Sequence, residues 1–247
     1  MLYPLLLTVI AGLSTLLGGL AIFFVRKTKD GYLGTAMGFS AGVMIFISFV
    51  ELLKESIEGV GYVSAVLAFF VGMLVVYLID VFVPHSYKGE CAYEDEKKKR
   101  LKHTGIVCAI GIAIHNFPEG IAVFFSSVSD ISLGITIALA IALHNIPEGI
   151  AVAMPIFYAT GSRAKAFWYS FLAGIAEPIG ALLAFVFLFK FITPTILDYI
   201  LGAVAGIMIF ISFDELLPYA YEKGSSNRII LGIFAGMAVM ALSLYLI

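Results

Sequence analysis

Long apolar runs alternate with short polar connections along the whole chain. A helix needs about twenty apolar residues to cross the hydrocarbon core of a bilayer, and the sequence contains eight windows of this kind. Their approximate bounds are 3–25, 33–53, 61–83, 104–126, 131–158, 166–190, 196–220 and 228–247. The pattern predicts an all-α, polytopic membrane protein in which residues 1–247 form a single transmembrane domain. The one long connection, 84–103, carries a run of charged residues and is expected to be a loop.

The composition supports a lipid environment. Hydrophobic residues make up 61% of the chain and charged residues 13%, whereas soluble domains average about 45–50% and about 25%. The formal net charge is −2 and no basic tract carries interleaved aromatic residues, so nucleic acid is not expected as a partner. Cys91 lies in the long connection and Cys108 in an apolar segment, which gives no disulfide framework.

The basic residues indicate how the chain crosses the membrane. The even-numbered connections hold only Lys54 and Lys190, and the odd-numbered connections hold all the other Lys and Arg residues. Cytoplasmic connections carry the excess of Lys and Arg in membrane proteins. We therefore expect the odd-numbered connections, including 84–103, to be cytoplasmic and both termini to lie outside, in a cell membrane.

An internal repeat links the two ends of the chain. Residues 41–53 read AGVMIFISFVELL, and residues 205–217 read AGIMIFISFDELL. Spans one to three therefore resemble spans six to eight. Because corresponding spans are five helices apart, the two copies cross the membrane in opposite directions, which is the inverted repeat of many secondary transporters. Spans four and five lie between the copies, where such proteins place the substrate site.

Those two central spans carry the most informative motif, His-Asn-x-Pro-Glu-Gly, at 115–120 and again at 144–149. In a helix the His and Glu of each copy are four positions apart and share one face. The residues with metal-binding side chains are His115, Asn116, Glu119, His144, Asn145 and Glu148. Two half-sites of this kind that face each other could close around one or two divalent cations.

Prolines mark where these helices are expected to bend. Pro118, Pro147 and Pro178 lack an amide hydrogen and release a backbone carbonyl one turn earlier. Glu177 precedes the third proline on span six and is the natural third carboxylate. A charge in mid-membrane costs about 2.5–3.5 kcal/mol, so three glutamates need a compensating cation. A single His or Glu could instead be satisfied by an interhelical hydrogen bond, but two copies plus a third carboxylate favour a metal.

Several other residues are weaker candidates. Glu51, Asp214 and Glu215 lie near span ends and are either solvated boundary residues or carboxylates at the two mouths of a pathway. Ser48 is more typical of a serine that bonds the helix backbone, and Met44 of core packing or of a soft ligand on the pathway. The long connection holds His85, Cys91 and His103, which could capture metal or belong to a solvated loop.

These features resemble the ZIP (Zrt/Irt-like) family of divalent metal transporters, and within it the bacterial ZupT-type branch. The doubled motif, Ala-Glu-Pro on span six, eight spans, outside termini and a long third connection carry the resemblance, which covers essentially the whole chain. It implies uptake of Zn2+, or of Fe2+, Mn2+, Co2+ or Cd2+, into the cytoplasm. The metal would be the cargo, and no cofactor is expected.

By position, the resemblance also implies two ion sites. One ion would be held by His115, Glu119, His144 and Glu148. The other would be held by Asn116, Glu119, Asn145, Glu148 and Glu177. Some family members have an acid or Gln in place of Asn145 or His144, so the site here is less negative. The resemblance further implies that spans one, four, five and six move as a unit against the other four.

A membrane metalloenzyme is the competing class, because His and carboxylate ligands could also hold a hydrolytic zinc or a di-iron centre. The chain has no His-Glu-x-x-His protease motif and no Glu-x-x-His pair of the kind that carboxylate di-iron sites use. We therefore expect a transporter rather than an enzyme, with divalent ions and the lipid bilayer as partners. A homodimer stays open.

Overall fold

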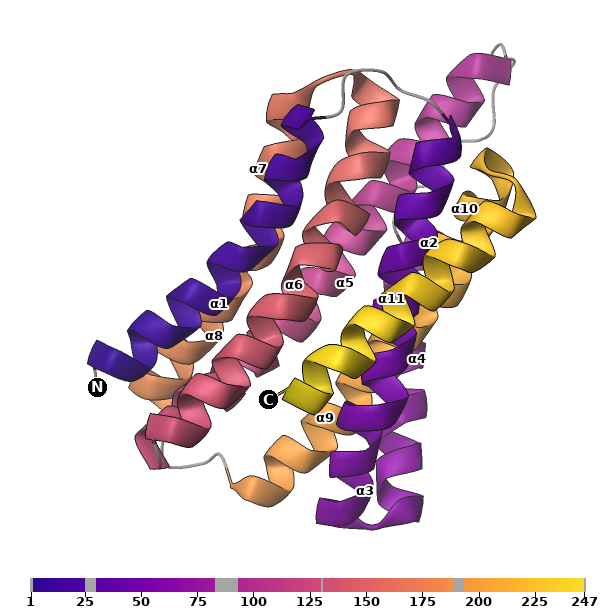
Figure 1. Ribbon diagram of the computed structural model, residues 1–247. Helices are drawn as coiled ribbons and strands as arrows, with labels where there is room; N and C mark the ends of the chain where they lie inside the picture. The colour runs from indigo at the N-terminus through magenta and orange to yellow at the C-terminus, as the bar shows by residue number, and fades with distance from the viewer. Residues whose placement is uncertain (1, 25–29, 83–92, 130, 189–192, 247) are drawn as a thin grey trace.

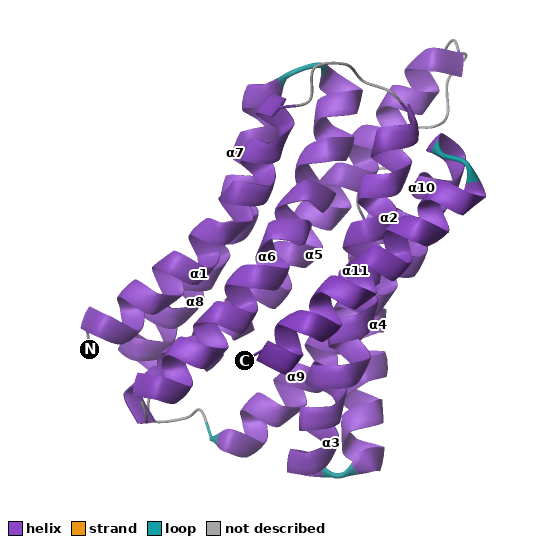
Figure 2. Ribbon diagram, viewed as in Figure 1, coloured by secondary structure: helices purple, strands orange, loops and turns teal. Residues whose placement is uncertain are grey.

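A computed structural model describes residues 2–24, 30–82, 93–129, 131–188 and 193–246. These residues form helices and short connections, with no strand among them (Figure 2). The helices are α1 (Leu2–Leu20), α2 (Asp30–Ile47), α3 (Leu53–Val60), α4 (Tyr62–Phe82), α5 (Tyr93–Ser129), α6 (Ile131–Thr160), α7 (Arg163–Gly174), α8 (Ala176–Leu183), α9 (Pro194–Phe210), α10 (Leu217–Lys223) and α11 (Ser226–Leu246). The prediction of an all-α fold is confirmed.

Eight helical stretches are long and apolar enough to cross a membrane, which confirms the eight predicted spans. They are Leu2–Phe24, Leu33–Val60, Tyr62–Val81, Leu101–Val128, Ile137–Thr160, Arg163–Phe187, Pro194–Glu222 and Ser226–Leu246. The second is longer than expected because α3 continues α2 through one π-helical turn. The connection expected at 84–103 is helical from Tyr93 onward, since α5 begins there, and residues 83–92 lie outside the described part of the chain.

The helices form two groups that meet along the middle of the molecule (Figure 1). In the first, which we call the α5–α6 group, these two helices pack on each other and on α1, α7 and α8. In the second, the α2–α9 group, α2 packs on α11 and α10, and α9 packs on α4 and α3. The spans of the α5–α6 group are one, four, five and six, the same set that the family resemblance assigns to one moving unit.

Glycines allow the helices of the α5–α6 group to approach closely. A Cβ atom at Gly120 of α5 would overlap the carbonyl oxygen of Glu177, and one at Gly149 of α6 would overlap that of Thr15. Both glycines end a His-Asn-x-Pro-Glu-Gly motif. The motif segment of α5 is therefore held against α8, and that of α6 against α1.

Matching π-helical segments interrupt two helices of the α2–α9 group. Ser48–Leu52 follows α2, and Ile211–Leu216 follows α9. Just inside each segment a serine hydroxyl donates to a backbone carbonyl one turn earlier, Ser48 to Met44 at 2.6 Å and Ser212 to Met208 at 2.8 Å. A π-helical turn widens the helix and often lies at a functional position. Ser48 thus makes the kind of backbone bond expected of it, and its place on the pathway stays a prediction.

Candidate metal site

All seven predicted ligands of the central site are buried inside the α5–α6 group. His115, Asn116 and Glu119 come from α5, their counterparts His144, Asn145 and Glu148 from α6, and Glu177 from the first turn of α8. None of the seven residues is more than 2% exposed. Polar and charged groups this deep in a membrane protein need partners, because the bilayer offers no water in their place.

The imidazoles and carboxylates pair crosswise between the two helices. His115 Nε2 lies 2.9 Å from Glu148 Oε1, and His144 Nε2 lies 3.3 Å from Glu119 Oε1. The spacing of four within each motif puts His and Glu on one face, as predicted from the sequence. Their contacts, however, are with the opposite motif. Residues from both copies of the motif are therefore brought together, and the arrangement joins α5 to α6.

The two asparagines tie this site to neighbouring helices. Asn116 Nδ2 donates to the carbonyl oxygen of Ala173 at 3.3 Å, and Asn145 Nδ2 donates to that of Ala11 at 3.1 Å. Asn145 Nδ2 also lies 2.8 Å from Glu177 Oε2, which links the third carboxylate to the site. These bonds use the NH2 groups of the two side chains. The two amide oxygens have no hydrogen bond and could contact an ion.

Acceptor atoms without a hydrogen bond are concentrated among these residues. Within the described part of the chain, buried atoms of this kind include both oxygens of Glu119, Oε2 of Glu148, Oε1 of Glu177, Oδ1 of Asn116 and of Asn145, and Nδ1 of His115. Buried acceptors are normally satisfied, and leaving one unpaired costs about 1–3 kcal/mol. Oxygen and imidazole nitrogen are also the ligand atoms of Zn2+ and similar divalent ions.

The proline beside Glu177 breaks its helix, and the prolines of the two motifs do not. Helix α7 ends at Gly174, the residue whose carbonyl Pro178 leaves free, and α8 begins at Ala176. In contrast, α5 and α6 continue through Pro118 and Pro147. Glu177 therefore lies at the first turn of α8, directly after the one-residue turn at Ile175.

A second cluster lies at the other end of α5. Asp80 at the end of α4, His103 on α5 and Glu215 in the π-helical segment after α9 have ligand atoms within 4.8 Å of one another. His103 Nε2 is 3.7 Å from Asp80 Oδ1, and His103 Nδ1 is 3.8 Å from Glu215 Oε1. In the described part of the chain, these three side chains already lie close enough together to hold one ion. At the central site the side chains instead form two separate His–Glu pairs.

This cluster changes several predictions. His103 was expected on a solvated loop, but it is a buried helical residue because α5 begins ten residues earlier. Sequence reasoning missed Asp80, whose only signal was an acid at the end of an apolar span. Of the two acids at 214 and 215, only Glu215 is buried, and Asp214 is exposed. The remaining loop candidates, His85 and Cys91, lie outside the described residues.

A cavity of about 500 Å³ leads to the central site from the opposite end of the bundle, where α3 lies. Its wall contains Glu119 and His144 at the inner part, and Glu51, Glu55 and Asp198 from α3 and its neighbours. Both groups of helices contribute to the wall, since α5 and α6 face α3 and α9 across it. One His–Glu pair is therefore reached from this end. Met44 is fully buried and is not among the lining residues.

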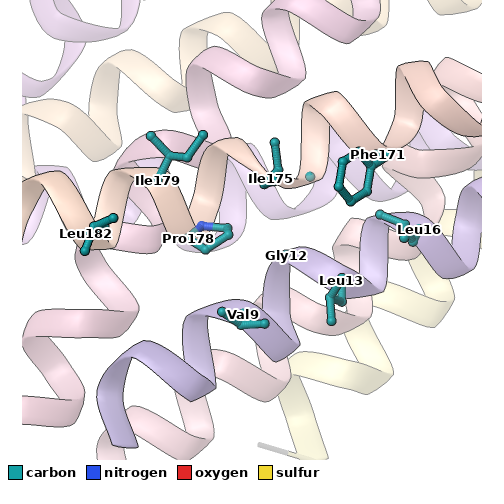
Figure 3. A pocket seen from close by; sticks show the side chains of 10 residues that line it. Val9, Gly12, Leu13, Leu16, Phe171, Ile175, Pro178, Ile179 and Leu182 are labelled. Atoms are coloured by element: carbon teal, nitrogen blue, oxygen red, sulfur yellow. The ribbon is translucent and has the colours of Figure 1, made fainter. Parts of the chain in front are cut away.

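A second cavity, of about 340 Å³, is an apolar groove between α1 and the α7–α8 break. Figure 3 shows its lining residues on the two sides of the groove, with Val9, Leu13 and Leu16 on α1 and Pro178 and Ile179 on α8. Its lining residues carry no ionisable side chain, so the groove offers no ligand for a cation.

Comparison with known proteins decides the family. Residues 88–244 match the family described as ZIP Zinc transporter. The chain belongs to the ZIP zinc transporter family. It is 49% identical to the zinc transporter ZupT of Nitratidesulfovibrio vulgaris, over 97% of this chain and 95% of that one. It is 52% identical to ZupT of Chlorobium phaeovibrioides, over 100% and 98% of the two chains, and 48% identical to ZupT of Clostridium perfringens, over 98% and 94%.

Family membership confirms the resemblance drawn from the doubled motif. It also decides between the two classes that the sequence left open, because a ZIP protein is a transporter and not an enzyme. The eight spans make it a multi-pass membrane protein.

Proposed function

We propose that this ZIP protein carries Zn2+, and related ions such as Fe2+, Mn2+, Co2+ or Cd2+, across the cell membrane into the cytoplasm. The observation that carries the proposal is the concentration of buried, unsatisfied acceptors on α5, α6 and α8. The relatives described as zinc transporters favour Zn2+ as the main cargo.

The ligands of that site are the seven residues His115, Asn116, Glu119, His144, Asn145, Glu148 and Glu177. One ion would displace the two direct His–Glu contacts and take an imidazole and a carboxylate from each helix. A second would use the two amide oxygens and Glu177, and share Glu119 and Glu148 with the first. Three carboxylates nearly balance two divalent charges, and the absence of thiolate favours binding that can be reversed, as transport requires.

The path through the membrane has a carboxylate at each mouth. With both termini outside, as the positive-inside rule indicates, the cavity beside Glu51 opens to the exterior and supplies Glu119 and His144. On the cytoplasmic side Glu215, together with Asp80 and His103, would receive the released ion. Asp214 would face the cytoplasm as well, as the positive-inside rule indicates for the 84–103 connection, and Met44 and Ser48 belong to the helical stretch that continues to Glu51.

An inverted repeat would explain how one central site can open to either side of the membrane in turn. Spans one to three and six to eight would be related by a pseudo-twofold axis in the membrane plane. Support comes from the 41–53 and 205–217 match and from the π-helical segments at corresponding positions. Rocking of the α5–α6 group against the α2–α9 group would then close one mouth and open the other.

Metal flux into sealed proteoliposomes tests the proposal. Purified protein is reconstituted with a zinc-sensitive dye inside the vesicles, and Zn2+ is added outside. We expect dye response with the intact chain and none with Glu119→Ala, which inserts normally but lacks a ligand shared by both ions. Metal binding without flux in the intact chain would contradict the proposed uptake of these ions.

A further inference from the structure

The outer part of the 500 Å³ cavity carries acidic residues that the central site does not use. Glu51 lies in the π-helical segment after α2, Glu55 on α3, and Asp198 near the start of α9. Glu51 and Glu55 are exposed, and Asp198 is partly exposed. Sequence reasoning gave no role to Glu55 or Asp198. We infer that these three carboxylates form a capture site for hydrated divalent cations, from which ions pass to Glu119 and His144. This inference rests on the proposed transport function.

The first argument is that the carboxylates lie near enough to act together. Glu51 and Glu55 are four residues apart on one helical stretch and line the same cavity, and Asp198 lines it from α9. The Asp198 carboxylate lies directly against the backbone of α3 at Gly59, where a Cβ atom would overlap it. The α3 and α9 carboxylates therefore share one negative field at the mouth.

The second argument concerns the far end of the same cavity. Glu119 lines it, is 2% exposed, and has no hydrogen-bond donor at either carboxylate oxygen within the described part of the chain. His144 Nε2 lies 3.3 Å from one of these oxygens. A buried carboxylate of the proposed central site is thus reached from the acidic mouth, so an ion held at the mouth would have a stronger ligand further along the same cavity.

The third argument is the nature of the wall between the two ends. It is formed by apolar side chains, among them Ile47, Leu197, Leu201, Ala122 and Ile141, and the lining residues include no Lys or Arg. Apolar walls around charges of one sign focus the electric field and raise the local concentration of counter-ions, which increases association rates by about 10-fold to 1000-fold. Within the described part of the chain, Lys54 on α3 is 66% exposed, pairs with Glu58 at 3.9 Å and is not among the lining residues.

The exposure of the mouth residues determines how they would bind. Solvated carboxylates hold a hydrated ion loosely, because the ion keeps most of its water shell and the charges are screened. Weak binding is suitable for an ion that must move inward, since a pathway needs sites that release what they bind. The ion would lose its water only at Glu119 and His144. The capture site should therefore increase the rate at which ions arrive. It should not affect the rates of the later transport steps.

The test compares Glu55→Gln/Asp198→Asn with Glu58→Gln in the same flux assay, with the dye inside the proteoliposomes and Zn2+ added outside. The control removes a carboxylate from the same helix that does not line the cavity. At low ionic strength we expect the KM for Zn2+ to rise about 10-fold in the double variant, with kcat within about twofold, and to rise less than about twofold in Glu58→Gln. High salt should remove most of the difference, because it screens exposed charges.

An independent variant displaces a carboxylate without removing its charge. Gly59→Ala must push Asp198 aside, and we expect a smaller increase in KM at unchanged kcat. An unchanged KM in the double variant, an equal increase in Glu58→Gln, or a loss of kcat alone would each overturn the capture site. Absence of flux in the intact chain would instead overturn the proposed function, so the two failures can be told apart.

Discussion

The carboxylate of Glu148 provides the most informative single perturbation. It is buried, it lies 2.9 Å from His115 Nε2, and its second oxygen has no hydrogen bond in the described structure. In Glu148→Ala the carboxylate is gone from both proposed ion sites, and His115 also loses its contact. Disturbing an outer-shell partner of a metal ligand costs about 10-fold to 100-fold in affinity, so we expect loss of a shared ligand to lower Zn2+ affinity by at least about 100-fold.

A second variant separates charge from hydrogen bonding. Glu148→Gln keeps an oxygen that can contact His115, so the fold should be retained, but it removes the negative charge that an ion needs. The alanine variant leaves a buried imidazole unpaired, which we expect to lower stability by about 1–3 kcal/mol. Zn2+ affinity is measured by competition with a chelating dye, transport by vesicle flux, and stability by thermal unfolding in detergent. Affinity and flux of Glu148→Gln close to those of the intact chain would refute the assignment.

Three further changes test separate parts of the site. Glu177→Ala should cause a milder loss of flux and reduce the bound metal by one ion, and an unchanged stoichiometry by mass spectrometry would count against its role. Asn145→Ala removes the contacts to Ala11 and Glu177. It should lower the affinity for the second ion by about 10-fold, measured by titration with Zn2+. His103→Ala should slow release to the cytoplasm while central affinity stays the same, measured as rapid-mixing flux against equilibrium binding; a parallel fall in affinity would argue against an exit role.

The eight spans and the seven candidate ligands that prove to be buried could be picked out from the sequence because their signals are local. Apolar length defines a span, and a spacing of four puts His115 and Glu119 on one face whatever the rest of the chain does. The same local reasoning located Glu177 by its proline. The break at Ile175 follows from Pro178, which removes the amide that would bond to Gly174.

The remaining features depend on how distant helices pack. The spacing within one motif cannot show that His115 contacts Glu148 rather than Glu119, since that depends on the contact between α5 and α6. Asp80 and His103 are brought together by α4 and α5, which are separated by residues outside the described part of the chain. His103 was assigned to a loop because a charged run masks the amphipathic pattern of a helix end.

Anomalous X-ray scattering from crystals soaked in Zn2+ tests the central claim most directly. The account predicts an anomalous peak between α5 and α6, within coordination distance of side chains from both motifs, with Glu119 and Glu148 among its ligands. A second peak beside Glu177 would give the full two-ion site. Strong peaks elsewhere, with the His115–Glu148 and His144–Glu119 pairs still in direct contact and no metal between them, would contradict it.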